Sequence, residues 1–262
     1  MRDRIRRLSW KVELVIVLVI AFGWTLPGTL RSLATAAEAV RGPKPPISDI
    51  SVWGTILFEL ILFSLLIPFL RMRGWTLARL GIQPSLRGYL QGGALALASY
   101  GLYVGFAVLV ASAWPEVARA LASTRLVGQA LSWSTVAVAS IINPFFEEIF
   151  VCGYVISVLT ERRTEVVAAP VPVIAEGESG EPAQFRGVSP VPVQGVSRST
   201  AVNISAVVRL SYHLYQGAAG VLAVVPLGLL FGFWFARTRQ LWPLIVAHAI
   251  LDFVALAASA GS

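Results

Sequence analysis

Two adjacent carboxylates inside an apolar stretch are the residues of this sequence best suited to chemistry. Glu147 and Glu148 lie in the run from Leu131 to Leu159, which is otherwise apolar or uncharged and contains no basic residue. This run is long enough to cross a bilayer as a helix. A carboxylate near the middle of a membrane costs roughly 2.5–3.5 kcal/mol on insertion scales, so a pair of them indicates a functional site.

The remaining chemistry-bearing residues lie at helical spacings from one another. The chain has two histidines, His213 and His248, and each has a charged residue four positions away. Arg209 precedes His213, and Asp252 follows His248. Residues four apart share a face of a helix, so each pair is expected to point in one direction.

Two carboxylates, two imidazoles and an aspartate suit peptide hydrolysis. A desolvated carboxylate can take a proton from water while an imidazole holds that water, and a second imidazole with Asp252 can stabilise the oxyanion. The same residue types also bind Zn²⁺, with Glu147, His213 and His248 as ligands and a metal-bound water as the nucleophile. The sequence leaves the zinc mechanism and the metal-free, glutamate-dependent mechanism open.

Three further residues are expected to support this site. Arg209 is the only basic residue within a predicted span, and an unpaired arginine there would be costly, so we predict an ion pair with Glu148 or Glu59. Glu59 itself reads as structural more than catalytic. Pro144 should loosen the helix just before the carboxylates, and with Asn143 it would admit water.

The composition indicates an integral membrane protein. The 262 residues are 56% hydrophobic and 13% charged, with a mean hydropathy of +0.73, whereas soluble domains carry about 25% charged residues. The net charge of +7 is first a signal of membrane topology, and no nucleic-acid partner is predicted. Cys152 is the sole cysteine, which excludes an intrachain disulfide.

The predicted fold is an all-α, polytopic transmembrane helix bundle that forms a single membrane domain over residues 1–262. About seven spans are expected: Val12–Leu30, Ile50–Leu70, Tyr89–Ala113, Leu131–Leu159, Ala201–Gln216, Val221–Ala236 and Leu241–Ala258. Residues 161–200 are polar and rich in Pro and Gly, and they are predicted to be a disordered cytoplasmic insertion.

The basic residues predict a cytoplasmic N-terminus. With seven spans, 15 of the 21 basic residues fall on the N-terminal side of the membrane and five on the other. At about 1.5 Å per helical residue, the acidic and histidine side chains named above, Glu59 included, then share one level in the cytoplasmic half of the membrane. Groups that share a depth are expected to meet around one water-filled cavity.

These residues resemble the motifs of the CPBP family of intramembrane proteases, which includes the CAAX prenyl endopeptidases and the Abi immunity proteins. The family motifs EExxxR, FxxxH and Hxxx(N/D) correspond to Glu147–Glu148–xxx–Cys152, Arg209–xxx–His213 and His248–xxx–Asp252. The resemblance covers about residues 130–258. It implies an endopeptidase in which Glu147 and His213 activate water. His248 and Asp252 would stabilise the oxyanion, and Glu148 would support the catalytic residues.

The chain departs from these motifs at Cys152, where the family has Arg, and at Arg209, where it has Phe. We hypothesise that Arg209 supplies the displaced guanidinium from the facing helix. The expected substrate is a membrane protein or a lipidated, CAAX-type peptide at the bilayer, and the composition and resemblance predict a bacterial inner-membrane location. The alternatives are a non-catalytic immunity or scaffold protein and a proton-coupled transporter, although no convincing inverted repeat is found.

Overall fold

The computed structural model describes residues 8–34, 48–115, 131–161, 195–214 and 217–258, and the backbone of two short strands at 163–166 and 190–193. Its helices are α2 (Trp10–Phe22), α3 (Leu26–Ala34), α5 (Asp49–Met72), α6 (Leu86–Ala113), α8 (Trp133–Glu147), α9 (Ser157–Thr160), α10 (Arg198–His213), α11 (Gly217–Thr238) and α12 (Trp242–Ala257). A 3₁₀ turn (Gly23–Thr25) joins α2 to α3, and a π-helical segment (Glu148–Ile156) joins α8 to α9. The predicted helical bundle is confirmed.

Serine side chains begin many of these helices. Ser9, Ser48, Ser85, Ser132 and Ser197 precede α2, α5, α6, α8 and α10, and each hydroxyl accepts a hydrogen bond from the backbone N–H three residues later. Such a cap satisfies a backbone donor that would otherwise have no partner and contributes about 1 kcal/mol. The starts of these helices are therefore encoded locally in the sequence.

Four helical stretches are long and apolar enough to cross a bilayer. They are Trp10–Arg31, Asp49–Met72, Leu86–Ala113 and Trp133–Thr160. Val224–Thr238, the part of α11 whose side chains the structure describes, and α12 are apolar but shorter. Large apolar side chains on α5 and α6 are exposed, among them Leu57, Leu65, Leu97 and Val108. These faces are suited to contact lipid, as an integral membrane protein requires.

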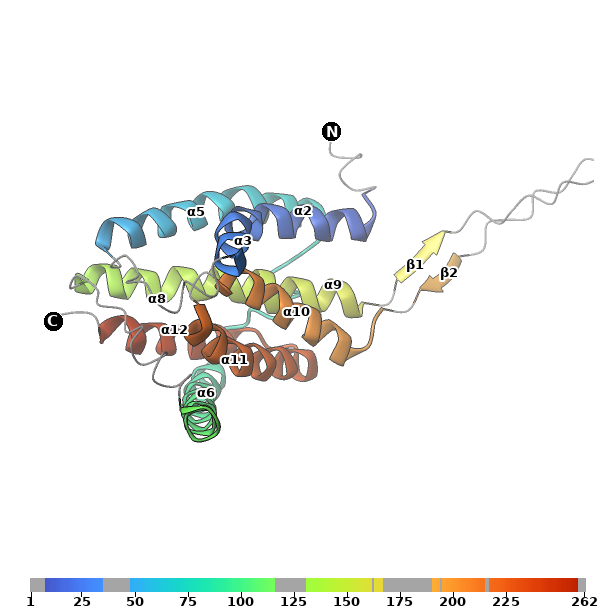
Figure 1. Ribbon diagram of the computed structural model, residues 1–262. Coiled ribbons are helices and arrows are strands. Elements are labelled where there is room, and N and C mark those ends of the chain that lie inside the picture. Colours follow the sequence, from blue (N-terminus) through green and yellow to red (C-terminus); the bar gives the residue numbers. More distant parts are fainter. Residues whose placement is uncertain are drawn as a thin grey trace, which may run out of the picture.

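The stretch that carries the carboxylate pair runs through the middle of the bundle. Figure 1 shows α8 and α9 between α5 and α2 on one side and α11 and α12 on the other. α5 packs against α8, α12 packs against both α8 and α6, and α10 packs against α11 and the π-helical segment. Every residue of that segment is buried, so its backbone is held by neighbours on all sides.

The region predicted to be disordered, residues 161–200, is ordered at both ends. Strands β1 (Arg163–Val166) and β2 (Pro190–Val193) pair antiparallel, with Arg163 opposite Val193 and Val166 opposite Pro190. Helix α10 already begins at Arg198. The prediction is wrong at these ends because backbone pairing and a serine cap order short segments that have no apolar core of their own. Residues 167–189 lie outside the described part of the chain.

A buried carboxylate links the first helix to the centre of the bundle. Glu13 of α2 is 4% exposed, and it accepts hydrogen bonds from Arg73 Nε at 2.6 Å and from Trp75 Nε1 at 2.7 Å. The hydroxyl of Tyr154, in the π-helical segment, donates to the same carboxylate at 3.1 Å. One acidic side chain therefore connects α2, the turn after α5 and the π-helical segment.

Replacing this carboxylate should destabilise the fold. We expect Glu13→Gln to lower the free energy of unfolding by about 1–3 kcal/mol, because the amide presents an N–H group to donors and leaves Arg73 without its buried counter-charge. Thermal unfolding in detergent measures the effect. Glu161→Gln, which removes the partly exposed ion pair with Arg79, is the matched control and should cost about 1 kcal/mol or less. Equal stability of the two variants would contradict the prediction.

Candidate functional site

The two carboxylates lie where the helix changes type. Glu147 is the last residue of α8, and Glu148 is the first residue of the π-helical segment. π-helical segments have wider turns than α-helices and are frequent at functional sites. Adjacent residues of an α-helix point about 100° apart. Both carboxylates nevertheless bind the forked side chain of Arg209.

Arg209, from α10, forms two buried ion pairs. Its Nη1 lies 3.2 Å from Glu147 Oε2, and its Nη2 lies 2.6 Å from Glu148 Oε1. The arginine is 1% exposed and Glu148 is completely buried, so water does not screen this interaction. The predicted pairing with Glu148 is formed. Glu59, the other predicted partner, has no ion pair with Arg209 in the described part of the chain.

The Arg209 guanidinium also lies close to Cys152, the residue that stands where the EExxxR motif has its arginine. Its Nη2 lies 3.8 Å from Cys152 Sγ. Gly228 of α11 makes room for the stem of this side chain, because a Cβ there would lie 3.2 Å from Arg209 Cδ. A guanidinium from α10 thus forms the ion pair with Glu148 that Cys152, which is uncharged, cannot form.

A tyrosine that the sequence reasoning missed also binds Glu147. The hydroxyl of Tyr212 donates to Glu147 Oε2 at 2.8 Å, so that this oxygen is held by two donors. The Tyr212 ring is stacked on Phe22 of the first membrane-crossing stretch, with 4.5 Å between centroids. The sequence could have indicated this contact, because Tyr212 follows Arg209 by three residues and residues i and i+3 share a face of a helix.

The second oxygen of Glu147 faces His213. His213 Nδ1 lies 2.9 Å from the carbonyl oxygen of Arg209, and a carbonyl only accepts hydrogen bonds. Nδ1 therefore carries a proton, and in the neutral ring Nε2 is the nitrogen with the free lone pair. Nε2 lies 3.8 Å from Glu147 Oε1, which is too long for a direct hydrogen bond. Two acceptors at this separation can each receive one proton of a single water molecule.

His248 forms the other half of the site. Its Nδ1 lies 2.8 Å from Glu148 Oε1, and its Nε2 lies 3.4 Å from Asp252 Oδ1. Both neighbours are carboxylates, so a ring that bonds to both carries a proton on each nitrogen. The Asn143 amide donates to Asp252 Oδ2 at 3.0 Å. The imidazole thus bridges Glu148 and Asp252 of α12, and Asn143 of α8 orients the aspartate.

Glu59, from α5, faces this cluster without bonding to it. The residue is 4% exposed, and its Oε2 has no hydrogen-bond partner in the described part of the chain. The charged groups that act on it are Glu147, Asp252 and His248. The structure therefore gathers the predicted acidic, imidazole and arginine side chains, with Glu59 at the edge of the group.

The predicted zinc ligands, Glu147, His213 and His248, do not converge. Within the described residues, no three or more His, Cys, Asp or Glu side chains are arranged to hold a metal ion. His248 is instead bonded to Glu148, and the Arg209 cation lies against Glu147. A zinc site needs three or four such donors around one point, and a guanidinium beside a ligand opposes a dication. The residues present do not fit a zinc ion.

Comparison with known families supports the resemblance over the C-terminal helices. Residues 179–254 match the family described as type II CAAX prenyl endopeptidase Rce1-like. The matched range covers less than half of the chain. It includes Arg209, His213, His248 and Asp252, and it begins after the carboxylate pair. No curated protein and no solved structure matches the chain.

Proposed function

We propose that this chain, whose C-terminal helices match the CAAX prenyl endopeptidases, is an intramembrane endopeptidase that activates water with Glu147 and His213. The substrate class is a membrane-embedded or membrane-adjacent peptide segment, with a prenylated CAAX-type peptide as the form that the family match favours. In the predicted orientation, with a cytoplasmic N-terminus, the substrate enters from the cytoplasmic half of the bilayer.

The observation that carries this proposal is the separation of 3.8 Å between Glu147 Oε1 and His213 Nε2. A water that donates one proton to each of these acceptors presents an oxygen lone pair to the substrate carbonyl. As the oxygen attacks the carbonyl carbon, Glu147 takes the proton and a tetrahedral oxyanion forms. Arg209 and Tyr212 hold the other oxygen of Glu147, and they therefore act as positioning residues.

The oxyanion is assigned to His248. Its Nε2–H bond to Asp252 is long at 3.4 Å, so this proton is weakly held and is available to a developing negative charge. When the C–N bond breaks, the proton on Glu147 passes to the leaving amine. The products are a carboxylic acid and an amine, and the site returns to its starting protonation state.

Cleavage by purified protein tests this function and its independence of metal. We expect the wild-type protein in neutral detergent to cleave members of a library of prenylated and unprenylated peptides, and we expect a chelator of divalent metals to leave the rate unchanged. Mass spectrometry of the products locates the broken bond. Loss of activity with chelator and recovery with Zn²⁺ would overturn the metal-free mechanism.

A further pair of variants separates hydrolysis from the non-catalytic alternatives. If a biological effect of the protein persists in both Glu147→Ala and His213→Ala, while both fold, then the site binds a partner or transports protons instead of cleaving a peptide. Loss of the effect in both variants, together with loss of peptide cleavage, supports the endopeptidase.

A further inference from the structure

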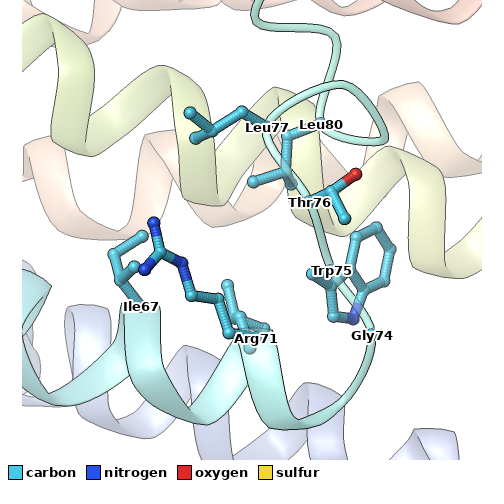
Figure 2. A pocket seen from close by; sticks show the side chains of 8 residues that line it. Ile67, Arg71, Gly74, Trp75, Thr76, Leu77 and Leu80 are labelled. Atoms are coloured by element: carbon cyan, nitrogen blue, oxygen red, sulfur yellow. The ribbon is translucent and has the colours of Figure 1, made fainter.

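A pocket with no assigned role lies at the turn that follows α5. Its volume is about 360 Å³, within the range of small-molecule sites, and none of the residues of the candidate active site lines it. Its walls are mostly apolar and include Ile67, Leu70, Trp75, Leu77 and Leu80, with Arg71 as the charged member. Figure 2 shows the Arg71 side chain on the Ile67 side of the pocket, directed toward Leu77 and opposite Trp75.

Arg71 differs from the two other arginines of this turn. Arg73 is bound to Glu13 and to the carbonyl of Leu8. Arg79 binds Glu161 through two nitrogens and lies 4.0 Å from the centroid of the Trp75 ring. The Arg71 side chain has no hydrogen bond or ion pair with the described part of the chain. The guanidinium at the pocket is therefore the one of the three that is left to bind an external anion.

The surface leading to the pocket is mostly apolar and exposed. Leu57, Ile61 and Pro68 lie on one face of α5 at helical spacings, and Arg71 continues that face at the last turn of the helix. Ser64 lies on the same face, and its hydroxyl donates a hydrogen bond to the carbonyl of Ile61. Because α5 has the length and composition of a membrane span, its end lies at the interface, where an arginine extends toward lipid headgroups. An apolar stripe that ends in an unpaired cation matches a molecule with an acyl chain and an anionic head.

We propose that this pocket binds an anionic phospholipid, with the phosphate on Arg71 and an acyl chain passing between Ile67 and Leu77 onto the exposed face of α5. The cytoplasmic leaflet supplies such lipids, and in the predicted orientation this turn is cytoplasmic. The proposal does not depend on the endopeptidase activity. A bound lipid would anchor the turn after α5 at the membrane surface. Because Trp75 lines the pocket and donates a hydrogen bond to Glu13, the lipid would also stabilise the interactions of that buried carboxylate.

Lipid-dependent stability in detergent tests the proposal without an activity assay. Wild-type protein, Arg71→Gln and Arg87→Gln are compared in neutral detergent with added phosphatidylglycerol or phosphatidylcholine. Arg87 is an exposed arginine at the start of α6 that does not line the pocket, so its variant is the matched control for loss of one positive charge. The measured quantities are the Tm and the lipid concentration that gives half of its shift.

We expect phosphatidylglycerol to raise the Tm of wild type and of Arg87→Gln more than phosphatidylcholine does. For Arg71→Gln, the half-saturating concentration should be about fivefold higher. Leu77→Ser, at a pocket-lining side chain that is 53% exposed, should weaken the same response. Equal responses to the two lipids, equal losses in the two arginine variants, or the full shift with inorganic phosphate alone would overturn the proposal.

Discussion

Peptide hydrolysis should fall by about 10²–10⁴-fold when Glu147 is replaced by glutamine. Glutamine keeps the size of the side chain and an oxygen that can accept from Arg209 and Tyr212, so the geometry of the site is largely retained. The amide cannot take a proton from the water that lies toward His213. The initial rate of cleavage of the best library peptide, at saturating substrate, measures the loss of the general base.

The matched control for this loss is Glu13→Gln. It removes another buried carboxylate that also binds an arginine and a tyrosine, but Glu13 lies outside the candidate active site. We expect Glu13→Gln to be less stable than wild type and to retain the rate of hydrolysis at temperatures at which it is folded. If both variants lose activity in proportion to their stability, then Glu147 has no role in proton transfer.

The largest effect on stability should come from Arg209→Met. Methionine fills much of the same volume, but it leaves Glu147 buried without a counter-charge and leaves Glu148 with the His248 imidazole alone. Breaking a buried ion pair in this way typically costs about 3–5 kcal/mol. Arg79→Met is the control, because the ion pair of Arg79 with Glu161 is partly exposed and should contribute about 1 kcal/mol or less. Thermal unfolding in detergent gives both values.

Moving the guanidinium back to its motif position provides a sharper test of the same interaction. Because Arg209 Nη2 lies 3.8 Å from Cys152 Sγ, the double variant Cys152→Arg, Arg209→Phe places a cation near Glu148 from the other helix. We expect the double variant to be more stable than Arg209→Phe alone and to recover part of the hydrolytic rate. If neither property recovers, then the positive charge must come from α10, and Arg209 does not substitute for the motif arginine.

The sequence alone determined much of the fold. The positions of the helices follow from apolar runs that are long enough for a bilayer and from serines that cap the helix starts, which are both local properties. The residues of the candidate site were also accessible, because charged groups in an apolar run are costly and therefore few. Because Arg209 is the only basic residue within a predicted span, the sequence also limited its expected partner to Glu148 or Glu59.

Tertiary structure alone decided how those residues meet. The π-helical segment, the binding of both carboxylates by one guanidinium and the contact of Tyr212 with Glu147 depend on how α8 and α10 pack. The same is true of Glu148 and His248, which are 100 residues apart in the chain and 2.8 Å apart in space. Local sequence sets the face on which a side chain lies, whereas the axial register and separation of two helices come from the packing of all the side chains between them. A shift of one residue in that register would move these hydrogen bonds beyond reach, which is why spacing in the sequence predicted the members of the site but not the bonds among them.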